Sequence, residues 1–302
     1  MEQQNPSFLL GPEDAQRACL LVHGFSGTPT EMLGLGEALA AQGIRVYGMT
    51  LAGHNASPEA LLQNGRKQWL TSVEIGLAQL ARYPQVFVAG LSMGGVLSLL
   101  LAIRYPKSIS GVIALSTPTR FTGGWQIRAV PLARYFITWF YPLQNLDFND
   151  PKVQAEVLQQ ARLRDPNATI DFSDAQAVAA IKQMVRIPIP AIAELFRLTD
   201  QCRRQLGKLR SPLLIIQSKR DQTVNPDCAF ELYRLTEAAS PKSLFWLTRS
   251  DHVITTGTER EEVYQYSIDF INSLSPLTLD AAKTAQSDHV LKDSLDEIHP
   301  DH

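Results

Sequence analysis

Short apolar runs alternate with helical patterns along the first 120 residues of the chain. Side chains such as Met32, Leu35 and Leu39 recur three and four positions apart, the spacing at which they share one helix face. Between such stretches lie runs that are apolar almost throughout, which is typical of strands buried on both faces of a sheet. They occupy residues 18–22, 44–49, 85–90 and 111–115. This alternation predicts a parallel sheet with right-handed crossovers.

Residues 121–208 interrupt this pattern, because they contain no apolar run of the same quality. The stretch begins with six aromatic residues between positions 125 and 141. Helical patterns follow at residues 150–164, 173–185 and 191–206. We therefore expect an inserted helical segment here.

The strand pattern resumes at residues 212–216 and 243–247, and a last helix is expected near residues 259–274. A short run at residues 8–10 resembles an antiparallel edge strand that turns back toward residues 18–22. The polar C-terminal residues predict a flexible tail. The chain thus divides into three parts. Residues 1–120 and 209–275 form a core, residues 121–208 an inserted helical segment, and residues 276–302 a tail.

Composition excludes several classes of function. The 28 Lys and Arg residues nearly balance the 30 Asp and Glu residues, which argues against a nucleic-acid-binding protein. Cys19, Cys202 and Cys228 are far apart in sequence, which makes structural zinc unlikely and fits a reducing compartment. Neither a signal-peptide pattern nor an apolar run long enough to cross a bilayer is seen, so we expect a cytoplasmic protein without a transmembrane segment.

The strongest chemical motif follows the run at residues 85–90. It reads Gly90-Leu91-Ser92-Met93-Gly94 and stands between a predicted strand and a helical pattern at residues 96–104. In this context it predicts a nucleophile elbow, a tight turn that strains the serine backbone and needs glycine on either side. The alternative is an ordinary strand-to-helix turn. Ser92 is therefore the candidate nucleophile, at a helix N-terminus that favours negative charge.

A serine hydroxyl is a weak nucleophile at neutral pH and needs a base. His23, His54 and His252 each follow a predicted strand, and the carboxyl ends of parallel strands share one sheet edge. All three could therefore reach the Ser92 region. In proteins with a nucleophile elbow on a sheet of this kind, the catalytic residues follow the chain order Ser, Asp, His. This order favours His252, which follows the last strand.

The acid that orients the histidine should follow the preceding strand. Asp221 stands there, and a role as a turn or capping aspartate is the alternative. Asp227 is a second candidate, whereas Asp251 adjoins His252 in sequence and is badly placed to hold its ring.

The anionic tetrahedral intermediate of acyl transfer needs backbone N–H donors. One donor should come from Met93, the residue after the nucleophile, and the second from Phe25 in the loop after the strand at 18–22. The side chain of His23 in the same loop is expected to be structural.

Several short motifs occur together in this chain: His23-Gly24-Phe25-Ser26-Gly27, Gly53-His54, Gly90-Leu91-Ser92-Met93-Gly94-Gly95, Asp221 and Asp251-His252-Val253-Ile254-Thr255. In this combination they resemble the α/β-hydrolase superfamily, and within it bacterial carboxylesterases and monoacylglycerol lipases. The likeness covers roughly residues 15–120 and 210–274.

This resemblance implies an α/β-hydrolase fold, with a mostly parallel eight-stranded sheet and a helical cap inserted between strands six and seven. It also implies a Ser92–Asp221–His252 triad, an oxyanion hole from Phe25 and Met93, and no cofactor or metal. The cap at residues 121–208 is longer than the short cap of compact carboxylesterases, so substrate size is not carried over.

The favoured function is a serine hydrolase of small-molecule carboxylic esters with an apolar acyl chain, such as a monoacylglycerol. Thioester hydrolysis or acyl transfer would use the same residues, and a peptidase or a non-catalytic binding protein on the same scaffold are further alternatives. The aromatic part of the cap allows three interpretations. Its side chains form part of the core, a flap over an acyl-binding site, or a surface for transient contact with lipid.

Overall fold

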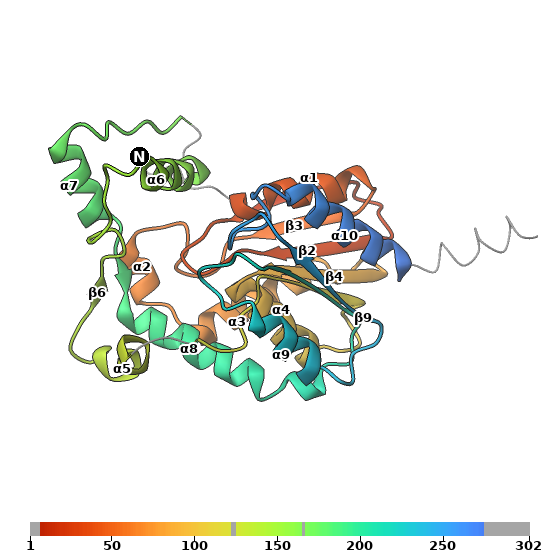
Figure 1. Cartoon of the computed structure of the whole chain (residues 1–302). Helices are drawn as coiled ribbons and strands as arrows, with labels where there is room; N and C mark the ends of the chain where they lie inside the picture. Colours follow the sequence, from red (N-terminus) through yellow and green to blue (C-terminus); the bar gives the residue numbers. More distant parts are fainter. Residues whose placement is uncertain (1–6, 122–124, 165–166, 275–302) are drawn as a thin grey trace, which may run out of the picture.

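The computed structural model describes residues 7–121, 125–164 and 167–274. At its centre lies a sheet with the strand order β1-β3-β2-β4-β5-β8-β9 (Figure 1). Only β1 is antiparallel to its neighbour, and all the other pairs are parallel. The strands are β1 (Phe8–Leu10), β2 (Arg17–Val22), β3 (Arg45–Met49), β4 (Gln85–Leu91), β5 (Gly111–Leu115), β8 (Leu213–Ser218) and β9 (Lys242–Leu247).

Each of the seven strand-like runs in the sequence forms one strand of this sheet, so the predicted α/β architecture is confirmed. The number eight is wrong for the described residues, because it came from the family resemblance and no eighth apolar run exists to form a strand. The inserted segment lies between β5 and β8, the fifth and sixth strands of this sheet, so two strands follow it, as two would follow a cap between strands six and seven of eight.

The pairing of β1 also differs from expectation. It is an antiparallel edge strand, but it pairs with β3, with Leu9 opposite Tyr47. The strand β2 is not available to it, because both edges of β2 are occupied by parallel ladders with β3 and β4.

Helices cover both faces of the sheet, and each face has its own core (Figure 1). Side chains alternate along the strands: in β2, Leu20 packs on one side and Leu21 on the other, and both are fully buried. This alternation between two cores is why the strands read as unbroken apolar runs. One face is covered by α1 (Leu33–Ala41) and α10 (Arg260–Ser273), and the other by α3 (Arg66–Gln79), α4 (Met93–Arg104), α8 (Ile189–Arg203) and α9 (Asp227–Leu235).

The inserted segment is mostly helical, as the sequence predicts, and its α5–α7 part projects beyond the sheet in Figure 1. The helix expected at residues 173–185 is capped by Asp174, whose carboxylate accepts the N–H of Gln176. A two-stranded ribbon was not expected, because strands of two residues leave no pattern in a sequence. The elements are α5 (Trp125–Ala133), β6 (Trp139–Phe140), α6 (Pro151–Arg164), α7 (Ala175–Met184), β7 (Ile187–Pro188) and α8.

Three shorter elements complete the described structure: α2 (Pro58–Leu62) and the 3₁₀ turns η1 (Pro29–Met32) and η2 (Leu206–Lys208). Among the described helices, none has the length and apolar character needed to cross a membrane. The predicted tail at residues 276–302 lies outside the described residues.

Candidate active site

Ser92 stands in the sharp turn between β4 and α4. Its backbone has φ 54° and ψ −117°, a conformation that residues with a side chain rarely adopt. The turn is anchored on both sides, because the Ser92 N–H donates to the Leu115 carbonyl over 2.8 Å and the Ser92 carbonyl accepts the Gly95 N–H over 2.9 Å. This strain presents the partly buried Ser92 side chain at the carboxyl edge of the sheet, as an elbow does.

The two motif glycines make room for the turn. A Cβ atom on Gly90 would overlap the backbone of Gly94, and one on Gly94 would overlap the carbonyl oxygen of Val22. The helix α4 can therefore approach β2 and β4 only because these side chains are missing.

Asp221 and His252 meet at the same edge of the sheet from the loops after β8 and β9. The Nδ1 atom of His252 lies 2.8 Å from Oδ2 of Asp221, whose side chain is fully buried. This is the geometry in which a carboxylate fixes the tautomer of an imidazole and leaves Nε2 free to act as a base. No hydrogen bond joins Ser92 Oγ to His252 within the described residues.

The carboxylate of Asp221 is held on both oxygens. Its Oδ1 accepts the N–H groups of Thr223 and Val224 at 2.9 and 2.8 Å, and Oδ2 also accepts Nε2 of Gln217 at 2.8 Å. Burial raises the pKa of Asp221, but the hydrogen bond and charge of His252 and the other donors outweigh it and hold the pKa below its usual value. Asp221 is therefore ionised at neutral pH.

The other two aspartates occupy different positions. Asp227 is exposed and is the first residue of α9. Asp251 accepts the N–H of His252 at 2.9 Å and that of Gln222 at 3.2 Å, so it joins two loops rather than holding the imidazole ring.

His23 and His54 lie together in a buried aromatic cluster. Their ring centroids are 5.1 Å apart, and burial lowers their pKa values to about 4 and about 3. His23 accepts the Leu51 N–H at Nε2 and donates from Nδ1 to the Gly24 carbonyl, which ties the loop to its surroundings. Both imidazoles are therefore neutral at pH 7, and neither contacts Asp221 within the described structure.

The predicted oxyanion-hole donors are the N–H groups of Phe25, in the loop after β2, and of Met93, the residue directly after Ser92. Met93 is the first residue of α4, where an N–H has no acceptor within the helix. The preceding loop lies close to the serine, because a Cβ on Gly24 would stand 3.6 Å from Ser92 Cβ. No hydrogen bond among the described residues uses the N–H of Phe25 or Met93, so both donors are unoccupied, as the predicted oxyanion hole requires.

A family model described as serine aminopeptidase, S33, a hydrolase family, matches residues 13–259. The chain belongs to this family. The carboxylesterase of Bacillus subtilis (strain 168) is 26% identical over 263 residues, which cover 85% of this chain and 93% of that protein. The thermostable monoacylglycerol lipase of Bacillus sp. (strain H-257) is 29% identical over 269 residues, which cover 85% of this chain and 91% of that protein.

Solved structures agree on the fold. One reported for the metagenome-derived lipolytic enzymes LipS and LipT superposes with a TM-score of 0.72 at 22% identity, and the match covers 90% of this chain and 98% of that chain. These comparisons confirm the predicted resemblance to α/β-hydrolases of the carboxylesterase and monoacylglycerol lipase type.

Three buried polar residues of this hydrolase support the site but were not singled out in the sequence. Gln217 holds Asp221, and Glu31 accepts the Gly24 N–H at 3.3 Å beneath the Phe25 loop. Glu259 accepts the N–H groups of residues 248–250, just before His252. The one available signal was at Gln217, a polar residue that ends the apolar run of β8 and is fully buried.

No group of three or more His, Cys, Asp or Glu side chains is arranged to hold a metal ion in the part of the chain that the structure describes.

Proposed function

We propose that this protein hydrolyses carboxylic esters through an acyl-enzyme on Ser92, with His252 as general base and Asp221 as the residue that orients it. The observation that supports this most directly is the 2.8 Å contact between Asp221 and His252 at the sheet edge where the strained Ser92 turn lies. Ester hydrolysis also fits the relatives, two of which are named carboxylesterase and monoacylglycerol lipase.

In the proposed reaction Ser92 Oγ attacks the ester carbonyl carbon while Nε2 of His252 takes its proton. The N–H groups of Phe25 and Met93 bind the oxyanion of the tetrahedral intermediate. The imidazolium then gives its proton to the leaving alcohol oxygen. Water attacks the acyl-enzyme in the same way, with His252 as base, and releases the carboxylic acid.

This reaction needs a hydrogen bond from Ser92 to His252 that the described structure does not contain. Catalytic hydrogen bonds are often long in the absence of substrate and tighten in the Michaelis complex. We expect this contact to form when an ester fills the site.

For the substrate we propose esters with an apolar acyl chain, such as monoacylglycerols, with residues 121–208 acting as a cap. Large apolar side chains are exposed on and after α5, among them Leu132, Tyr135, Phe136 and Ile137, and Phe136 is 81% exposed. Exposed aromatic and aliphatic groups on one segment suit transient contact with a lipid surface, where such substrates gather.

Covalent labelling tests the nucleophile. An organophosphonate should add one adduct to the protein by mass and abolish esterase activity. Ser92→Ala should lose both the adduct and the turnover of p-nitrophenyl esters, and His252→Ala should lose the turnover, while both stay folded by circular dichroism. The control Ser108→Ala changes an exposed serine and should keep both. An adduct on folded Ser92→Ala would refute the assignment.

A peptidase is the second candidate, because the family model carries the description serine aminopeptidase. The triad would be the same, so only substrates separate the two functions. Turnover of a series of p-nitrophenyl esters and monoacylglycerols should exceed turnover of aminoacyl anilides by orders of magnitude. The reverse ranking would favour the peptidase. Thioesters and alcohol acceptors in the same assay address thioester hydrolysis and acyl transfer.

A further inference from the structure

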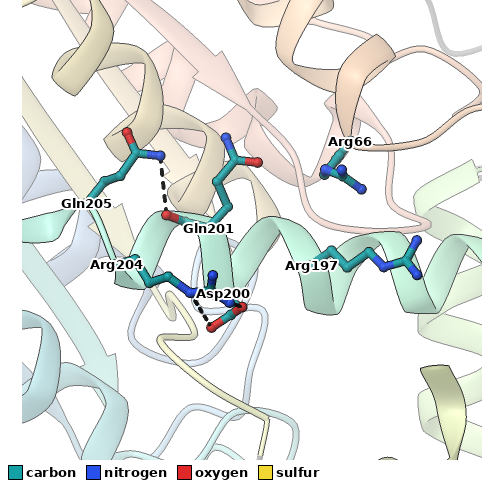
Figure 2. A pocket seen from close by; sticks show the side chains of 6 residues that line it. All are labelled: Arg66, Arg197, Asp200, Gln201, Arg204 and Gln205. Carbon is teal, nitrogen blue, oxygen red and sulfur yellow. Dashed lines mark hydrogen bonds and ion pairs between the residues drawn. The ribbon is translucent and has the colours of Figure 1, made fainter.

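Two adjoining hollows lie between the start of α3 and helix α8, with volumes of about 410 and about 480 Å³. They share Arg66 and Arg197, and we call them together the basic groove. Figure 2 shows Arg66 facing α8 from the start of α3, with Arg197 on α8 and the Arg204–Asp200 ion pair farther along. None of the residues proposed for ester hydrolysis lines this groove.

Three arginines from separate segments converge on one carboxylate in the groove. The carboxylate of Glu194 in α8 forms ion pairs with three arginines. They are Arg66 of α3 at 2.6 Å, Arg134, the residue after α5, at 3.2 Å, and Arg197 of α8 itself at 2.8 Å. Glu194, Arg134 and Arg66 are partly buried, with side-chain exposed fractions of 20, 21 and 31%, whereas Arg197 is exposed at 43%. The contacts of Arg66 and Arg134 with Glu194 are therefore less screened than those on an open surface.

The positive charge of the groove exceeds what Glu194 can neutralise. Lys67 also lines it, so four basic residues face one acidic residue in the smaller hollow. A guanidinium has five N–H donors, and each of the three arginines uses one nitrogen on Glu194. Their other nitrogens make no hydrogen bond within the described residues.

The first turn of α3 adds to this field. Gly65, Arg66 and Lys67 form the N-terminus of that helix and line the groove, where the helix dipole is positive. Burial would raise the pKa of Glu194, but the hydrogen bonds and charges of the three arginines outweigh it and lower the pKa. The groove therefore favours negative charge.

We propose that the basic groove binds a phosphate group, with its oxygens on the guanidinium N–H groups of Arg66 and Arg197 that Glu194 leaves unused. Planar guanidinium groups bind phosphate oxygens in pairs, and a dianion would offset most of the surplus charge. Arg134 and Lys67 supply the remaining attraction. The phosphate belongs either to a free phosphorylated molecule or to a lipid headgroup, since both present the same oxygens.

Isothermal titration of the full chain with inorganic phosphate tests the site, with chloride at matched ionic strength as the reference. Arg66→Gln and Arg197→Gln should each weaken phosphate binding about 10-fold, because each removes charge-assisted hydrogen bonds. Glu194→Gln should strengthen binding by a similar factor, because it removes the competing carboxylate. The control Arg260→Gln changes an exposed arginine that forms an ion pair with Glu261 far from the groove and should leave binding unchanged.

The opposite effects of the arginine and glutamate variants keep the test decisive even if one variant folds poorly. Phosphate that binds no better than chloride, and vesicles that bind equally well with and without phosphatidic acid, would together overturn the proposal. Binding that is insensitive to all three groove variants would also overturn it.

The source of the phosphate follows from a second measurement. Sedimentation with phosphatidylcholine vesicles, with and without phosphatidic acid, should show groove-dependent binding if the ligand is a lipid headgroup. Binding of soluble phosphate without vesicle binding assigns a free phosphorylated molecule. Ser92→Ala should bind phosphate like the unmodified chain, so the result does not depend on the proposed ester hydrolysis.

Discussion

Gln217 offers the sharpest test of how the site is held. Its fully buried amide donates from Nε2 to Oδ2 of Asp221, the same oxygen that accepts His252 Nδ1. The Oε1 atom of Gln217 is buried without a hydrogen-bond partner in the described structure. The Nε2 atom of Gln217 thus stabilises the fold through a hydrogen bond, whereas its buried Oε1 atom destabilises it because it lacks a partner.

Replacing Gln217 with leucine of similar size should therefore change activity more than stability. Loss of a hydrogen bond to a carboxylate destabilises by about 1.5–3 kcal/mol, and removal of a buried carbonyl without a partner restores about 1–3 kcal/mol. We expect the free energy of unfolding to change by about 1 kcal/mol or less. Asp221 then has one donor fewer to fix its position beside His252. If the resulting misplacement raises the activation free energy by about 1.4 kcal/mol, kcat/KM falls about 10-fold.

The assay is kcat/KM for a p-nitrophenyl ester from pH 5 to 9, with urea unfolding of the same samples. Without the Gln217 donor, Asp221 is less firmly placed beside His252, so kcat/KM should be lower than that of the unmodified chain throughout this pH range. Gln217→Glu keeps a donor only while the new carboxyl is protonated, so its deficit should grow with pH. A Gln217→Leu variant that unfolds several kcal/mol more easily but keeps the original profile would show a purely structural residue.

Further expectations concern the acid, the loop before the histidine and the elbow. Asp221→Asn should lower kcat about 100- to 10,000-fold through the wrong imidazole tautomer, whereas Asp227→Asn should be nearly silent in the same assay. Burial raises the pKa of Glu259, but backbone donors lower it to about 2, so its stabilisation is complete above about pH 4.5 and is lost toward pH 2. The gap in unfolding free energy between Glu259→Gln and the unmodified chain should therefore narrow over that interval. Gly94→Ala should destabilise by about 1–3 kcal/mol in urea unfolding, because its Cβ would overlap a β2 carbonyl.

Each of these has an outcome that contradicts it. An inactive Asp227→Asn beside an active Asp221→Asn would exchange the two assignments. If the difference in unfolding free energy between Glu259→Gln and the unmodified chain stayed constant down to pH 2, the ionised carboxylate of Glu259 would not contribute the expected stability. Gly207→Ala, whose added Cβ has no neighbour closer than 3.9 Å, is the matched control for Gly94→Ala and should stay close to the unmodified stability.

The sequence by itself determined the strands and the elbow. Buried parallel strands are apolar on both faces, so seven short runs were enough to locate all seven strands of the main sheet. The turn at Ser92 is equally local, because its strain and its glycines are set within five residues. The count of eight failed because it was taken from a family and not from a run in this chain.

Only the tertiary structure decided which distant side chains meet. The sequence placed three histidines at one sheet edge and favoured His252 by chain order alone. The fold places His252 beside Asp221 and buries His23 and His54 among aromatic rings. The contacts between Gln217 and Asp221 and between Arg66 and Glu194 follow the same rule, since each depends on loop paths and helix packing. Hydrophobic periodicity records which face of an element is buried, but it carries no information about which polar groups face one another across the space between elements.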